Sequence, residues 1–470
     1  MLRPALRLPS LLLVVTLMLA LIQQSQSASS QTMAKAQEFR LPNGFVGVVI
    51  PDNRAPVVTH MVWYRIGAAD EAAGKSGIAH FFEHLMFKAT KKMASGEFSK
   101  IISRLGGNDN AFTSHDATAY FQRISKSRLP QIMEMEADRM VNLQLGEKEV
   151  LTERDVILEE RRSRVENNPS AILDEQMSAA LYRNHRYGVP VIGWEHEIAA
   201  LSRKDALDFY KAYYAPNNAI LVVSGDVTLD EVKKLAEATY GKLKPSAAIK
   251  PRDRVKEPPL RTPLRVELKD QRAGKPMLTR HYLAPSYVTA AAGEAEALDL
   301  LMKVVGGGST SRLYKKLVVE EKIAANAGGY YGGSGLDSTK IGVYAVPQDG
   351  GTLDQVEASI DAVLEDVKAN GVTLAELDRA KAGYVAEYVY ENDNQSTMAR
   401  RYGWGLVVGR TIADIDAWPD RISKVTLDEV KKAAQTFLDL RRSVTGTLVP
   451  IAAEVAPGAA KPVASPPSRS

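Results

Sequence analysis

The chain contains no cysteine among its 470 residues. This absence excludes a disulfide framework, a thiol nucleophile, a lipid-modified cysteine and any zinc site with thiolate ligands. A metal ion bound by this chain must therefore be held by histidine and carboxylate side chains. Histidine is itself scarce, at seven residues in the whole chain, so two histidines that lie four residues apart are informative.

A strong excess of charge is also missing. The formal net charge is only +4, so the composition gives no reason to expect a nucleic-acid-binding protein. The length is sufficient to bury large cores and predicts two or three domains.

The N-terminus has the pattern of an export signal. Two arginines in MLRPALR precede the apolar run LPSLLLVVTLMLALI, and Ser25 and Ser27 are suitable small residues for cleavage near Ala28. This pattern predicts a cleavable signal peptide over residues 1–27 and a periplasmic or secreted protein. The alternative is an uncleaved membrane anchor, because the apolar run is not far short of a spanning helix.

Strand and helix patterns alternate along the rest of the chain, which predicts an α+β fold. We expect an N-terminal domain over 37–244, a Pro-rich and charged linker over 245–263, a C-terminal domain over 264–450 and a disordered tail over 451–470. A helix-turn-strand pattern near 201–227 recurs near 425–450, which hints at an internal duplication. The heptapeptide TLDEVKK occurs at both 228–234 and 426–432. Its flanks do not match in register, and we interpret this identity as coincidence.

The stretch GIAHFFEHLMFKAT carries the strongest chemical pattern. On a helix over Gly77–Lys88, His80 and His84 lie on one face and can both reach one cation. Glu83 lies beside them without needing to ligate, where a general base for a zinc-activated water belongs. The order His-x-x-Glu-His is the inverzincin signature. The alternative is two helix histidines paired with a surface glutamate.

A catalytic zinc needs a third protein ligand from another element. The helical stretch TERDVILEERRSR offers Glu153, Glu159 and Glu160. Glu153 and Glu160 share one face two turns apart, so one of them could ligate while the other orients a ligand. Spacing alone does not decide between Glu159 and Glu160, and a solvated acidic face is the alternative for this helix.

Together with GGNDNAFTSHDATAYF, ERDVILEERR and HRYGVPVIGWEHEI, these stretches resemble the pitrilysin/insulinase-type zinc metallopeptidases, in particular the bacterial branch similar to mitochondrial processing peptidase. The resemblance spans roughly residues 38–450. It implies one Zn²⁺ per chain held by His80, His84 and Glu160, with Glu83 as the catalytic base and Glu153 supporting a ligand.

The same resemblance implies a fold and a substrate strand. We expect two homologous α/β-roll domains, each a mixed or antiparallel sheet flanked by helices, facing each other around a chamber with metal in the first domain only. It also implies that Asn110 and Ala111 bind substrate on an edge strand, which would read the peptide backbone. His115 is the nearest rival histidine, and we expect it to be a strand residue without a metal.

One departure from the family concerns transition-state support. Relatives carry an arginine followed seven positions later by a tyrosine in the domain without metal. Here Arg400 and Arg401 are followed at that spacing by Val407 and Val408, and Tyr402 is out of register. The resemblance therefore favours a homo- or heterodimer, in which a related subunit without the zinc motif could supply the Arg/Tyr pair.

We therefore expect a zinc-dependent endopeptidase that hydrolyses peptides or unfolded polypeptides, with Glu83 as general base. The alternative is a non-catalytic binding or assembly subunit of the same fold. A zinc enzyme of other chemistry is a third possibility.

Overall fold

The computed structural model describes residues 35–451. The predicted signal peptide lies outside these residues, as does all but the first residue of the predicted tail. Within residues 35–451, none of the helices is both long and apolar enough to span a membrane.

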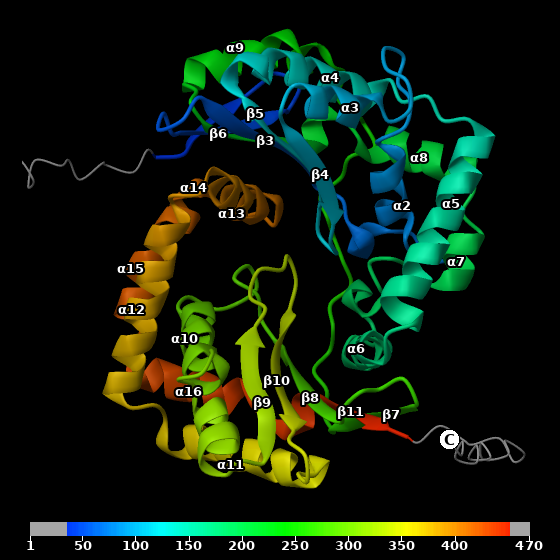
Figure 1. Ribbon diagram of the computed structural model, residues 1–470. Coiled ribbons are helices and arrows are strands. Elements are labelled where there is room, and N and C mark those ends of the chain that lie inside the picture. Colours follow the sequence, from blue (N-terminus) through cyan, green and yellow to red (C-terminus); the bar gives the residue numbers. More distant parts are fainter. Residues whose placement is uncertain (1–34, 452–470) are drawn as a thin grey trace, which may run out of the picture.

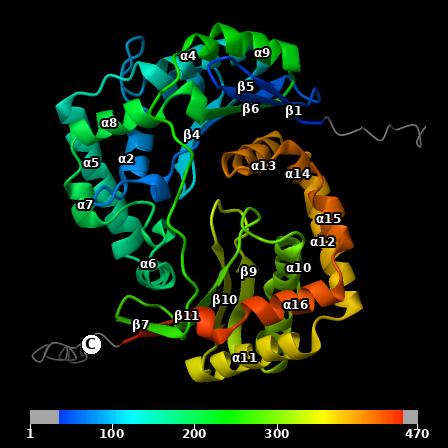
Figure 2. The same ribbon diagram turned by 180° about the vertical axis from the view of Figure 1, so that it is seen from behind.

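The structure contains two domains, each built on its own sheet (Figures 1 and 2). The first has the strand order β1-β2-β6-β3-β5-β4. Its strands are β1 (Gln37–Arg40), β2 (Val46–Pro51), β3 (Val57–Tyr64), β4 (Asn108–Thr113), β5 (Thr118–Ser125) and β6 (Ala219–Gly225). The second has the order β7-β11-β8-β10-β9. Its strands are β7 (Leu264–Asp270), β8 (Met277–Ala284), β9 (Ala324–Tyr331), β10 (Thr339–Pro347) and β11 (Ser443–Pro450).

The two sheets share one topology. In each, the last strand along the chain pairs in parallel with an early strand, β6 with β2 and β11 with β7, and every other pairing is antiparallel. β4 and β9 occupy equivalent free edges. The expected fold class, two similar α+β domains with mixed sheets flanked by helices, is therefore confirmed. The repeated heptapeptide begins α9, after β6, but α16, before β11, so it does not mark equivalent elements.

Helices cover one face of each sheet from within the same domain. In the first domain these are α2 (Ile78–Leu85), α3 (Glu97–Arg104), α4 (Leu129–Val141), α5 (Glu147–Arg161), α8 (Arg203–Tyr213) and α9 (Leu229–Ala238), with the short α7 (Glu195–Ala199) beside α5. In the second they are α10 (Glu294–Gly306), α11 (Leu353–Asn370), α12 (Leu374–Glu391), α15 (Trp418–Lys424) and α16 (Leu427–Phe437).

The opposite face of each sheet is covered by a helix from the other domain. α13 (Gln395–Val407), followed by the short α14 (Ile412–Asp416), packs Met398, Ala399 and Leu406 against Trp63 and Val222 of the first sheet. Figure 1 shows α13 under this sheet, on the side away from α4 and α9. In return, α6 (Pro169–Leu181) packs against the second sheet. Because each sheet needs cover on both faces, this exchange joins the two domains through apolar cores.

The chain between the domains adds a polar tie. Residues 247–263 contain no helix or strand. The buried guanidinium of Arg254 forms ion pairs with Asp70 at 2.7 Å and Asp116 at 2.5 Å in the first domain and with Asp337 at 3.2 Å in the second. Such a paired, buried charge orients the segments that it joins.

Candidate active site

Helix α2 carries the two histidines and has a defined start. Gly77 precedes it with φ +84°, and a Cβ there would lie 2.4 Å from the carbonyl oxygen of Ile192, so glycine is required. The buried carboxylate of Glu71 accepts hydrogen bonds from the N–H groups of Gly77 (3.0 Å) and Ala79 (2.9 Å). This carboxylate caps the positive end of the helix dipole and fixes the helix that bears the site.

The predicted helix over Gly77–Lys88 is too long at its C-terminal end. The helix ends at Leu85, and the N–H groups of Phe87 and Lys88 bond to carbonyls only three residues back, those of His84 and Leu85. This tighter last turn removes Phe87 from the helix. His80, Glu83 and His84 remain on it.

Helix α5 brings Glu160 to the two histidines. Glu160 Oε2 lies 3.7 Å from His80 Nε2 and 3.4 Å from His84 Nε2. One ligand atom from each of His80, His84 and Glu160 lies within 4.8 Å of the others. Glu159 on the same helix has a side chain that is 71% exposed and pairs with Arg162 at 3.1 Å. The structure thus places Glu160, and not Glu159, beside the histidines.

The three side chains fit a zinc ion. Ligand atoms at ordinary zinc distances in a tetrahedral site are roughly 3.4 Å apart, which is close to the two separations above. Glu160 Oε2 is buried and forms no hydrogen bond to any group of residues 35–451, an arrangement that a cation would satisfy. Two imidazoles and one carboxylate also leave a fourth position for water.

Glu153 orients the His84 ring through the ring nitrogen that faces away from the cluster. Its Oε1 lies 2.9 Å from His84 Nδ1, and Lys88 forms an ion pair with its other oxygen. A proton on Nδ1 donated to Glu153 leaves Nε2 free to face a metal. The contact with His84 is the main reason that the pKa of Glu153 falls to about 2. Burial would lower the pKa of His84, but the nearby carboxylates of Glu153 and Glu160 outweigh it and raise that pKa to about 9 in the metal-free chain.

The other two side chains of the motif, His80 and Glu83, are more deeply buried than His84. Burial, with the charge of His84, lowers the pKa of His80 to about 4, so His80 is neutral and able to ligate. Burial also raises the pKa of Glu83, toward the range that suits a general base. The Thr113 hydroxyl donates a 2.5 Å hydrogen bond to Glu83 Oε2 and fixes its position.

Thr113 belongs to the free edge strand β4, which carries the predicted substrate residues. A cavity of about 1020 Å³ lies over the cluster and is lined by Glu83, Asn110, Ala111 and Thr113 among others. The exposed Asn110 accepts a 2.8 Å hydrogen bond from the N–H of Ala111 through its own side chain. A peptide strand added to this edge would form hydrogen bonds with the backbone groups of β4.

The segment that follows β4 is not part of a strand. Residues 114–117 form a turn between β4 and β5, so His115 is a turn residue, and the expectation that it lies in a strand is wrong. Its Nε2 lies 3.0 Å from the carbonyl oxygen of Val189, and it does not join the histidine cluster.

The residues considered for transition-state support lie on α13. None of Arg400, Arg401 and Tyr402 lines the cavity over the histidine cluster. The Arg401 guanidinium bonds to Glu391 at 2.5 Å, and the Tyr402 hydroxyl donates to Asp416 at 2.5 Å. Both side chains therefore already have hydrogen-bond partners within their own domain.

Sequence reasoning missed three residues of the site. Thr113 could have been found, because the alternation of a strand places it on the same face as Ala111. Arg164, whose Nη1 lies 2.7 Å from Glu160 Oε1, could also have been found, because it stands four residues after Glu160 and this helical spacing pairs the two side chains. Glu71 gave no pattern signal, because its contact with the start of α2 depends on the path of the chain between them.

The second domain has an equivalent helix without these ligands. α10 follows Gly293 as α2 follows Gly77, and both helices come after the equivalent strands β8 and β3. Counted from these two glycines, Glu296 occupies the position of His80, Asp299 that of Glu83 and Leu300 that of His84. Arg421 donates a 2.6 Å hydrogen bond to Glu296, so this position already has a cationic partner.

Comparison with known proteins identifies the family. A family model described as Insulinase (Peptidase family M16) matches residues 47–194, and one described as Peptidase M16 inactive domain matches residues 200–384. The zinc protease PqqE of Helicobacter pylori is 31% identical over 429 residues, which cover 89% of this chain and 94% of that protein. The chain belongs to peptidase family M16.

Further relatives of this M16 chain agree. A probable mitochondrial-processing peptidase subunit beta of Schizosaccharomyces pombe is 26% identical over 444 residues, 89% of this chain and 93% of that protein. A crystal structure of a protease from Helicobacter pylori superposes with a TM-score of 0.83 at 30% identity, over 89% of this chain and all of that one. The first half of the periplasmic protease PqqL of Escherichia coli shares the fold, with a TM-score of 0.76 at 19% identity over 88% of this chain and 92% of that one. The named zinc proteases among these relatives support a peptidase-type function that involves zinc.

Proposed function

We propose that this M16 chain is a zinc-dependent endopeptidase for peptides or unfolded polypeptides. The observation that carries the proposal is the convergence of His80, His84 and Glu160 ligand atoms within 4.8 Å, beside a Glu83 carboxylate that is bonded to the free edge strand. A zinc ion bound there would polarise the scissile carbonyl and lower the pKa of water.

The chain's own residues would perform the proton transfers and the positioning. β4 aligns the substrate backbone by strand addition, next to the cluster. Glu83, with its pKa raised by burial, takes the proton of the attacking water and returns it to the leaving amine. Thr113 holds that carboxylate in place, and Glu153 holds the His84 ring.

Two further expectations accompany this proposal. The N-terminal pattern supports export to the periplasm or beyond, where unfolded polypeptides would be substrates. Arg401 and Tyr402 are occupied by Glu391 and Asp416, which supports a dimer in which a related subunit completes the transition-state contacts.

The test is zinc content together with cleavage of an internally quenched, unfolded peptide by the purified mature chain. We expect about one zinc per chain, loss of cleavage on chelation and its return with added zinc. If the chain binds zinc but cleaves only after a related subunit is added, the dimer proposal is supported. A zinc-loaded chain that cleaves under neither condition would favour a non-catalytic assembly subunit.

A further inference from the structure

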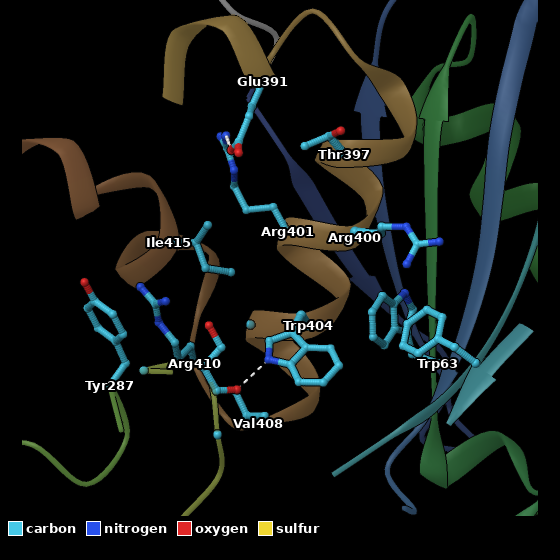
Figure 3. Close-up of a pocket in the computed structure, with 15 residues that line it drawn as sticks. Trp63, Tyr287, Glu391, Thr397, Arg400, Arg401, Trp404, Val408, Arg410 and Ile415 are labelled. Carbon is cyan, nitrogen blue, oxygen red and sulfur yellow. Dashed lines mark hydrogen bonds and ion pairs between the residues drawn. The ribbon is translucent and has the colours of Figure 1, made fainter. Parts of the chain in front are cut away.

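A second cavity adjoins the one over the histidine cluster. It has a volume of about 400 Å³, lies between the two domains and shares the side chain of Phe112 with the first cavity. Figure 3 shows its walls, which are aromatic and cationic. They include Trp63, Phe112, Arg400, Arg401, Trp404 and Arg410.

Two of the three arginines are already engaged. Arg401 forms its ion pair with Glu391, and its guanidinium lies 3.9 Å from the ring centroid of Tyr388. Arg410 lies 4.8 Å from the centroid of Tyr287 and donates a 3.1 Å hydrogen bond to the carbonyl oxygen of Asp414. In Figure 3 Arg401 points toward Glu391, away from the strands.

Arg400 differs from both. Its guanidinium lies over two aromatic rings, 5.0 Å from the centroid of Phe112 and 4.6 Å from that of Phe121. Within residues 35–451 no carboxylate forms an ion pair with it, and partial burial alone lowers its pKa. Arg400 is exposed, and stacking on rings positions its guanidinium while leaving the N–H groups available to another partner.

The two rings place this charge beside the substrate strand. Phe112 lies on β4, and Phe121 on β5 pairs with Asn110 of β4. Phe112 packs against Arg400, whereas the next residue, Thr113, bonds to Glu83, so successive side chains of β4 point to opposite faces of the sheet. A peptide added to the edge of β4 would lie about 4.8 Å from it and direct every second side chain toward Arg400.

We propose that Arg400 forms a subsite that binds a carboxylate of the peptide, so that the enzyme favours acidic substrates. The carboxylate could be an Asp or Glu side chain or the C-terminal group, since both offer two oxygens to a guanidinium. This inference rests on the proposed peptidase function. It makes Arg400 a determinant of specificity through contact with the substrate.

The experiment compares kcat/KM for quenched peptides that carry one Glu, Gln or Lys at each position within four residues of the cleaved bond. We expect one position at which Glu exceeds Gln by about tenfold, the size of a charge-assisted hydrogen bond. Arg400→Gln should remove this preference by lowering cleavage of the Glu peptide more than that of the Gln peptide, and Arg400→Lys should keep part of it. Arg400→Glu should favour Lys at that position. Arg379→Gln, at an exposed position of α12, is the matched control.

Peptides with a free or an amidated C-terminus distinguish the two sources of the carboxylate. If the preference follows the free C-terminus and depends on Arg400, the subsite binds that group. Equal cleavage of Glu and Gln peptides by the wild type would overturn the proposal, as would an equal loss for both in Arg400→Gln.

A second measurement separates this inference from the proposed activity. Binding of the same peptides to a Glu83→Gln chain, followed by fluorescence anisotropy, requires no cleavage. If no peptide is cleaved but Glu peptides bind about tenfold tighter than Gln peptides in an Arg400-dependent way, the subsite stands and the peptidase function fails.

Discussion

The Thr113 hydroxyl donates a 2.5 Å hydrogen bond to Glu83 Oε2. This bond joins the side chain that we propose as the base to the strand that we propose as the substrate guide. A peptide that pairs with β4 is thereby placed in a fixed relation to Glu83. The bond also stabilises the ionised carboxylate and so opposes the rise that burial causes in the pKa of Glu83.

Replacement of Thr113 by valine should therefore affect catalysis and leave zinc binding intact. Without the hydroxyl, Glu83 loses its orientation and its pKa rises further. We expect kcat to fall by about tenfold, the value of one hydrogen bond to a charged group, and the acid limb of the rate profile to move to higher pH. Thr113→Ser keeps the hydroxyl and should stay near wild type. A valine variant with an unchanged pH profile would contradict this role.

The choice between the neighbouring glutamates Glu159 and Glu160 can be tested by zinc affinity. Glu160→Gln should weaken binding strongly, because an amide replaces the anionic ligand beside both histidines. Glu159→Gln should leave the affinity unchanged, because Glu159 pairs only with Arg162 at the surface. Competition against a chelator of known affinity measures both variants, and equal losses would refute the assignment.

Removal of Glu153 should weaken zinc binding without removing a ligand. In Glu153→Gln the amide is a poorer acceptor for the His84 Nδ1 proton, and we expect the zinc affinity to fall by roughly 10- to 100-fold, which is typical of such supporting groups. The same chelator competition measures it. Zinc affinity equal to that of the wild type would show that Lys88 and packing suffice to hold the ring.

The residues of α2 illustrate how much the sequence could predict. His80, Glu83 and His84 were predicted together because helical spacing puts them on one face wherever the helix packs. Selecting Glu160 over Glu159 from spacing alone was not possible, because that choice depends on the rotation of α5 against α2, a tertiary property. The mixed two-domain architecture followed from element order and from the resemblance.

The exchanged helices α6 and α13 were beyond sequence reasoning. Their apolar residues indicate that each packs on something, but a hydrophobic pattern does not say which sheet it covers. The turn at 114–117 could have been found, because the polar run Thr113–Asp116 separates the apolar residues of β4 from those of β5.

The packing of α13 on the first sheet gives a prediction for stability. A Cβ on Gly403 would lie 2.1 Å from Trp63 Nε1, which is fully buried. Gly403→Ala should therefore destabilise the protein by about 1–3 kcal/mol, since the crowding outweighs the better helix propensity of alanine. Gly383→Ala on α12, whose Cβ would meet only the end of Lys303 at 3.7 Å, should stabilise it by about 0.5–1 kcal/mol. Chemical denaturation measures both.

Asp299, at the position on α10 that Glu83 occupies on α2, should make stability depend on pH. Burial raises its pKa to about 7, from an ordinary value of 3.8, despite the hydrogen bond from Tyr287. The folded chain therefore holds a proton that the unfolded chain has lost between these values, and the free energy of unfolding falls as pH rises toward 7. Asp299→Asn cannot ionise, so its stability relative to wild type should increase from pH 5 to pH 8. A constant difference across this range would contradict the prediction.

The most direct test of the account is cleavage of a quenched unfolded peptide by Glu83→Gln and wild-type chains at equal zinc content, with the related subunit added if wild type requires it. Glu83 lies beside the three ligands without belonging to their cluster, so the variant should bind zinc as wild type does and lose cleavage by at least about 100-fold, the usual contribution of a general base. A variant that keeps its zinc and still cleaves at the wild-type rate would contradict the assignment of Glu83 and the mechanism built on it.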